Sequence, residues 1–167
     1  MVGADEGIRE TYEGDAERPL GGYAAAMAGY AAYAGAWAAL IRCRGRLPER
    51  HDAMDVALTA VATFRFSRLV TKGAVTSPLR APFTTYQGPQ GPAEVSEESR
   101  EGHRHTVGEL LTCPFCMSLW VGTALTAGRC VWPRATRTVT AVMASLAGAD
   151  ALQLAYSGLM DKVTGGE

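Results

Sequence analysis

Two cysteines separated by two residues have the clearest capacity for chemistry in this sequence. Cys113 and Cys116 flank Pro114 and Phe115 where a charge-free helix is expected to begin. The positive end of a helix dipole stabilises a thiolate, and a second thiol one turn away resolves a mixed disulfide. The Pro-aromatic interior is similar to that of glutaredoxins, but no thioredoxin-like strand and helix pattern surrounds it. A structural role, thiol–disulfide exchange and metal binding all remain open, and the structural role is favoured.

A zinc site would need ligands beyond this pair. His103 and His105 lie just upstream, and two imidazoles with two thiolates would complete a tetrahedral shell around Zn²⁺. The His-x-His spacing differs from that of zinc fingers, and the segment is expected to be a loop. Zinc bound by His103, His105, Cys113 and Cys116 is therefore the alternative to two solvated histidines.

Asp150 lies near the middle of the last expected helix and is the only charge between residues 138 and 160. A carboxylate at the centre of a membrane helix costs about 2.5–3.5 kcal/mol, so it requires a partner. Arg65 and Arg68 share one face of the second expected helix. We expect Asp150 to pair with one of them and to fix the helix register, since a single pair is not an ion or proton pathway.

Glu109 and the segment 77–83 are the remaining candidates. Glu109 could act as a base for a cysteine, although a carboxylate in a first helical turn is ordinary capping chemistry. Arg80 could bind lipid headgroups, or its segment could simply anchor a turn, since Pro78 and Pro82 exclude a regular helix. The candidate motif residues are Ser77, Pro78, Arg80, Pro82, Phe83, Glu109 and Trp120.

Charge-free runs must supply the elements that position these residues. Residues 21–41 and 110–128 carry no charge and approach the ~20 residues that cross a hydrocarbon core. Residues 138–160 add a third run, and a shorter helix over 54–70 carries the two arginines. The sequence therefore predicts an all-α integral membrane bundle of about four transmembrane helices.

The polar segments divide the chain. The expected domains are a disordered acidic tail (1–20), an N-terminal transmembrane helix with its basic loop (21–53), a core of three helices (54–160) with a mobile loop at 84–105, and a short tail (161–167).

Bulk composition excludes some classes of protein. The net charge of −1 gives no basic surplus for nucleic acid, and four cysteines are too few for a disulfide scaffold. The mean hydropathy of −0.01 is that of a soluble protein, but the average hides the charge-free runs. The acidic start is unlike a signal peptide, so an uncleaved anchor is expected. The high alanine content and the scarcity of lysine suggest a bacterial genome.

Arginines in the short loops predict the orientation, because such loops are retained in the cytoplasm. Both termini and the 71–110 segment would then lie outside the cell. The basic loops carry Arg42, Arg44, Arg46 and Arg50 after the first helix, and Arg129, Arg134 and Arg137 before the last.

Three ordered motifs resemble one bacterial membrane family. They are TFRFSRL at 63–69, VTSPLRAPF at 75–83 and GELLTCPFC at 108–116, followed by Trp120. The family is catalogued as domain of unknown function thirteen-sixty, and some members are labelled sporulation proteins. The resemblance covers about residues 54–160 and implies three spans, so the Ala-rich first helix is an N-terminal addition. It implies a membrane location and no assigned activity.

These observations predict a non-enzymatic structural or interaction protein of the bacterial cell envelope. Its expected partners are the lipid bilayer and other membrane proteins, and residues 71–116 are expected to form the surface that carries its function. One alternative is a membrane thiol–disulfide oxidoreductase that uses Cys113 and Cys116. The other is a small ion-handling protein that uses Asp150 with Arg65.

Overall fold

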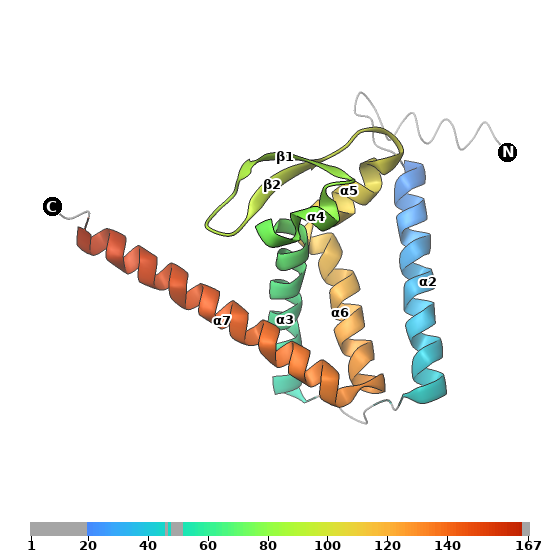
Figure 1. Cartoon of the computed structure of the whole chain (residues 1–167). Coiled ribbons are helices and arrows are strands. Elements are labelled where there is room, and N and C mark those ends of the chain that lie inside the picture. Colours follow the sequence, from blue (N-terminus) through green and yellow to red (C-terminus); the bar gives the residue numbers. More distant parts are fainter. Residues whose placement is uncertain (1–19, 46, 48–51, 165–167) are drawn as a thin grey trace.

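The computed structural model describes residues 20–45, 47 and 52–164. Residues 1–19 of the predicted acidic tail and residues 46 and 48–51 of the basic loop lie outside the described part, whereas Arg42 and Arg44 of that loop belong to the last turn of α2. The chain is mostly helical, and Figure 1 shows the arrangement. The elements are α2 (Leu20–Arg44), α3 (Ala53–Lys72), η1 (Ala74–Thr76), α4 (Ser77–Arg80), β1 (Thr84–Pro89), β2 (Val95–Ser99), η2 (Gly102–Arg104), α5 (His105–Thr112), α6 (Pro114–Val131) and α7 (Pro133–Thr164).

Within the described residues, two helices, α2 and α7, are long and apolar enough to cross a membrane. Helices α5 and α6 meet at a bend of 75°. If the two together are counted as one span, they make a third candidate. The charges of α3 explain why it is not among these candidates. The structure therefore shows a mostly helical chain with two candidate membrane-spanning helices, and the four-span bundle remains a proposal.

Helices α3, α6 and α7 pack against one another, and α2 packs on α6 (Figure 1). The C-terminal ends of α2 and α6 and the N-terminal ends of α3 and α7 meet at one end of the molecule. Helices α4 and α5 and the two strands cover the other end. The 32 residues of α7 rise about 48 Å, which exceeds a ~30 Å hydrocarbon core. Residues 151–164 leave the bundle and are exposed throughout, so residues 161–164 of the predicted tail continue this helix.

Small and hydroxyl residues allow the helices to approach closely. A Cβ atom on Gly128 of α6 would lie 2.9 Å from the Oγ1 of Thr136 in α7. Thr136 and Thr140 of α7 and Ser67 of α3 are buried. Helices in lipid gain no hydrophobic energy from touching, so they associate through close packing of such residues.

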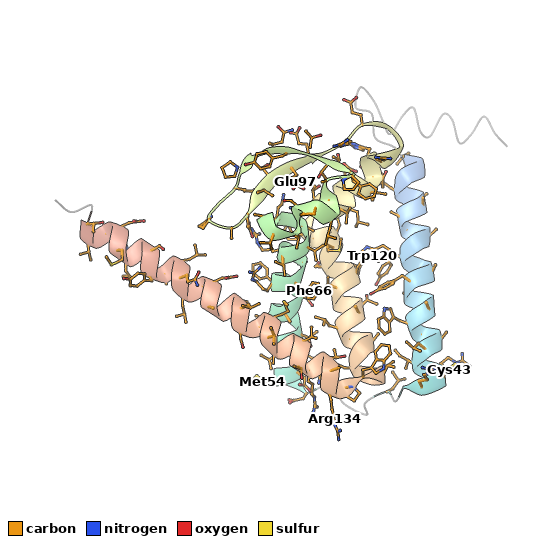
Figure 2. All side chains as sticks on the ribbon, viewed as in Figure 1. Cys43, Met54, Phe66, Glu97, Trp120 and Arg134 are labelled. Carbon is orange, nitrogen blue, oxygen red and sulfur yellow. The ribbon has the colours of Figure 1, made fainter. Side chains whose placement is uncertain are left out.

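Aromatic rings join α2 to α6. The rings of Tyr33 and Trp120 lie 5.0 Å apart, and those of Tyr30 and Trp120 lie 5.4 Å apart at 77°. Each phenol also has a polar partner on α6: Tyr30 Oη lies 2.9 Å from Thr123 Oγ1, and Tyr33 Oη donates to the carbonyl of Trp120. Trp120, labelled in Figure 2, therefore holds the Ala-rich helix.

The structure differs from the expectation of a loop over 84–105. Strands β1 and β2 pair antiparallel, with a bulge between Tyr86 and Gly88 and a turn in which Gly91 has a φ of +146°. Gly, Pro and Ser are typical of loops, which explains the prediction. Arginines from α3 and α4 bind two hairpin carboxylates, and such distant contacts are not visible in the local sequence.

The third expected helix is preceded by an additional one. Cys113 has φ −97° and ψ 106°, so it ends α5 and begins α6. Pro114 explains the break, because proline disfavours helical geometry at the residue before it.

Candidate functional site

Arg80 lies fully buried beneath the hairpin. Its Nε and Nη2 donate to the two carboxylate oxygens of Glu97 at 2.7 and 3.0 Å. Its Nη1 donates to the carbonyl of Val70 at 2.6 Å, and Nη2 to that of Gly73 at 2.9 Å. The guanidinium therefore caps the C-terminal end of α3 while it binds the hairpin. This geometry supports the turn-anchor interpretation, since its donors face inward rather than toward lipid.

Glu97, labelled in Figure 2, also accepts a hydrogen bond from Thr84 at 3.0 Å. Burial by itself raises the pKa of this carboxyl, but the hydrogen bonds from Arg80 and Thr84 outweigh it and hold the pKa below its usual value. Glu97 is therefore ionised at neutral pH and faces the Arg80 guanidinium.

The other motif residues shape the same turn. Ser77 Oγ accepts from Arg80 at 3.2 Å, and Pro78 lies in the first turn of α4, where its missing N–H is tolerated. Phe83 donates its N–H to the carbonyl of Arg80, and the Pro82 carbonyl accepts from Arg104. The segment contains one turn of α-helix, so the expectation that Pro78 and Pro82 exclude a regular helix was wrong: Pro78 lies where no N–H is needed, and Pro82 follows the end of α4.

Of the two partners that the sequence offers Asp150, the structure places Arg65 beside it. Arg65 Nε lies 2.5 Å from Asp150 Oδ2, which joins α3 to α7. Arg68 instead donates to both oxygens of Glu94, at 2.9 and 2.5 Å. A second arginine of α3 therefore holds the hairpin.

The two motif cysteines are free thiols at the start of α6. Cys113 is half-buried and its sulfur accepts the N–H of Cys116 at 3.2 Å, which makes it the N-cap of the helix. Cys116 is exposed. The Glu109 carboxylate accepts from Tyr23 at 2.7 Å and lies 3.4 Å from His105, and among the described residues no hydrogen bond joins it to either thiol.

The proposed zinc ligands do not gather among the residues that the structure describes. No group of three or more His, Cys, Asp or Glu side chains is placed to hold a metal within these residues. His105 Nδ1 lies 3.1 Å from the hydroxyl of Ser99, and its Nε2 faces Glu109. The side chain of His103 is outside the described part of the chain.

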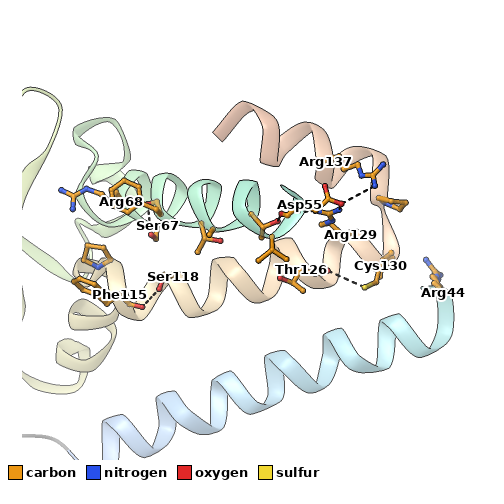
Figure 3. A pocket seen from close by; sticks show the side chains of 18 residues that line it. Arg44, Asp55, Ser67, Arg68, Phe115, Ser118, Thr126, Arg129, Cys130 and Arg137 are labelled. Atoms are coloured by element: carbon orange, nitrogen blue, oxygen red, sulfur yellow. Dashed lines mark hydrogen bonds and ion pairs between the residues drawn. The ribbon is translucent and has the colours of Figure 1, made fainter. Parts of the chain in front are cut away.

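A groove between α3 and α6 was not foreseen from the sequence (Figure 3). It has a volume of about 950 Å³ and extends from Pro114 at the start of α6 to Pro133 at the start of α7. A hydroxyl at every fourth residue of α3 is the signal that could have revealed it. Hydroxyl and aromatic side chains line its walls, and arginines lie at its two ends. The wall residues include Thr59, Thr63, Phe64, Ser67, Ser118 and Thr126. Arg44, Arg129 and Arg137 lie at one end, and Arg68 lies at the other.

Comparison with known proteins gives one match. A family model described as "Protein of unknown function (DUF1360)" matches residues 58–156, which is more than half of the chain. No curated protein and no solved structure matches.

Proposed function

The chain belongs to the DUF1360 family of proteins of unknown function, and we propose that it is a multi-pass membrane protein with a structural or interaction role in the bacterial cell envelope. Its matched region carries all three sequence motifs. The family has no assigned activity, so the proposal depends on the distribution of side chains in the structure.

Most large apolar side chains lie on the surface of the protein rather than in its core, and the proposed membrane location rests on this observation. Among the described residues, the buried apolar side chains are Ala62, Leu125 and Ala127, whereas six polar or charged residues are buried. Large apolar side chains are exposed on every long helix. Exposing such area to water costs about 25 cal/mol per Å², and lipid removes that cost.

The outer half of α7 supports an interaction role. Leu152, Leu154, Tyr156, Leu159 and Val163 are each more than 60% exposed, and Figure 1 shows this segment leaving the bundle. Such a helix is stable where lipid or another membrane helix surrounds it.

Fractionation of cells that express the full chain tests the membrane location. We expect the protein to stay in the membrane pellet after alkaline carbonate and high-salt washes and to dissolve only in detergent. A protein that is monodisperse in buffer without detergent would contradict the proposal.

A photo-crosslinking residue at Leu154 tests the interaction role. We expect a covalent adduct of discrete mass in whole cells, whereas the same residue at exposed Tyr86 of the hairpin should give none. If position 154 yields only lipid adducts, α7 contacts no protein partner there.

Thiol–disulfide exchange is the second candidate, and the hydrogen bond from the Cys116 N–H to Cys113 Sγ favours it. The two thiols therefore lie one turn apart at the start of a helix, which is the arrangement found in dithiol redox sites. If the pair exchanges, a glutathione redox series should convert it between dithiol and disulfide, and Cys113→Ser should abolish that change in maleimide uptake. Thiols that never form a disulfide would exclude this activity.

A further inference from the structure

The walls of the α3–α6 groove are apolar despite their hydroxyl groups. Thr59 donates its hydroxyl to the carbonyl of Asp55 at 2.7 Å, and Ser67 donates to that of Phe64 at 3.0 Å. On α6, Ser118 donates to the carbonyl of Phe115 at 2.7 Å. Because these hydrogens bond within their own helices, the groove presents hydrocarbon and does not require a polar occupant.

The length of the groove suits an acyl chain. Its wall includes both ends of α6, whose 18 residues rise about 27 Å. This approaches the ~30 Å thickness of a hydrocarbon core, so the groove extends across the lipid-filled layer.

One end of the groove has an excess of positive charge. Asp55 is bonded to Arg129 and lies 3.7 Å from Arg137, so it faces two guanidinium groups. Arg44 lines the same end, as Figure 3 shows, and within the described residues no carboxylate is paired with it. Three arginines and one aspartate leave a site that attracts an anion. At the opposite end, Arg68 is neutralised by Glu94.

We propose that this groove binds an anionic phospholipid, with one acyl chain between α3 and α6 and its phosphate near Arg44 and Arg137. The inference rests on the proposed membrane location and adds a ligand to it. Basic pockets between membrane helices on the cytoplasmic side bind such headgroups, and the positive-inside rule puts this end of the bundle there.

Native mass spectrometry of the delipidated full chain in detergent tests the ligand class. We expect phosphatidylglycerol to bind more tightly than phosphatidylcholine with the same acyl chains, and inorganic phosphate not to compete because it lacks a chain. Equal affinity for the two lipids would overturn the proposal.

Paired substitutions test the headgroup site. Arg44→Ala with Arg137→Ala should weaken phosphatidylglycerol binding by about thirtyfold, since each arginine near an anionic surface contributes about fivefold. Arg42→Ala with Arg134→Ala removes the same charge from the same end but from residues that do not line the groove. An equal loss from both pairs would overturn the site.

Ala60→Trp tests the acyl-chain site, because Ala60 lines the groove and a tryptophan there would fill it. It should weaken the binding of both lipids, whereas Leu58→Trp should not, because Leu58 lies on the opposite side of α3 by helical periodicity and does not line the groove. If Ala60→Trp fails to fold, the two arginine pairs still test the lipid proposal, because these arginines lie at the surface.

Three further outcomes can be told apart. A dimer mass that Ala60→Trp abolishes would assign the groove to a second copy of the chain and overturn the lipid proposal. A chain that needs no detergent would overturn the proposed function itself. A detergent-requiring chain without lipid preference would overturn the groove alone.

Discussion

At the scale of single residues, Arg80 and Glu97 decide how one end of the molecule is closed. The side chain of Arg80 is fully buried and that of Glu97 is 5% exposed, so each charge depends on the other. The sequence marks Arg80 through its proline-flanked motif, but nothing local selects Glu97 from the three acidic residues of the hairpin. That choice depends on the strand register, which pairs Thr84 with Ser99.

Glu97→Gln should lower the free energy of unfolding by about 3–5 kcal/mol, because it leaves a buried guanidinium without its counter-charge. Thermal unfolding in detergent measures the effect. Glu98→Gln is the control, since Glu98 is exposed and bonds only to Gln87 within the described residues. Equal unfolding temperatures for the two variants would contradict the importance of the buried pair.

The same pair predicts a dependence on pH. The pKa of Glu97 is lower in the folded chain than its ordinary value of 4.5, so its stabilisation is complete above about pH 4.5 and is lost as the pH falls through the folded value. The difference in stability between wild type and Glu97→Gln should therefore stay constant near neutrality and narrow below about pH 4.5. A difference that widens in acid would contradict this.

At the scale of elements, the helices followed from their apolar runs, while the hairpin and α5 did not. Charge-free segments predict α2, α6 and α7 because they are properties of the local sequence. The 75° bend at Cys113 depends on Pro114, which the sequence shows, and on the hairpin packed beside α5, which it does not. The groove was missed for a related reason, because it requires knowledge of which helix lies opposite Thr59 and Ser67.

Gly108→Ala tests the contact between α5 and the hairpin. A Cβ atom there would lie 2.7 Å from both the carbonyl oxygen of Phe83 and the Cβ of Ser99. We expect a loss of about 1–3 kcal/mol, which exceeds the gain in helix propensity of up to about 1 kcal/mol. The control Gly148→Ala has open space and should be neutral or stabilising in the same melt.

A double-substitution cycle tests the link between α3 and α7. Arg65→Met and Asp150→Leu should each lower the unfolding temperature in detergent, and the double variant should recover part of the loss, because neither charge is then left alone. We expect a coupling of at least about 0.5 kcal/mol. Additive effects would show that the pair does not fix α7, and Asp161→Asn at the exposed end of α7 controls for general charge effects.

At the scale of the whole molecule, the family expected from the three motifs is confirmed, as is a mostly helical chain. Figure 2 shows Cys43 and Arg134 at one end and Glu97 at the other. The basic residues that surround Cys43 suggest a cytoplasmic end.

Single-cysteine variants test this orientation, since Cys43 and Cys116 are both exposed and lie at opposite ends. A membrane-impermeant maleimide added to intact cells should label Cys116 and spare Cys43. Permeabilised cells should show both labelled, which confirms that each thiol reacts. The inverse pattern would place the termini inside the cell.

The aromatic and hydrogen-bonding contacts that join α2 to α6 have a consequence for the synthesis of this protein. Tyr33 reaches Trp120 across 87 positions of sequence, and Tyr30 reaches Thr123 across 93. A ribosome therefore releases α2 long before it has made the helix that receives it. On the proposed membrane location, α2 stays in the bilayer without that partner during the interval, and a copy that ends before residue 120 never acquires the ring and hydroxyl contacts that hold α2 to α6.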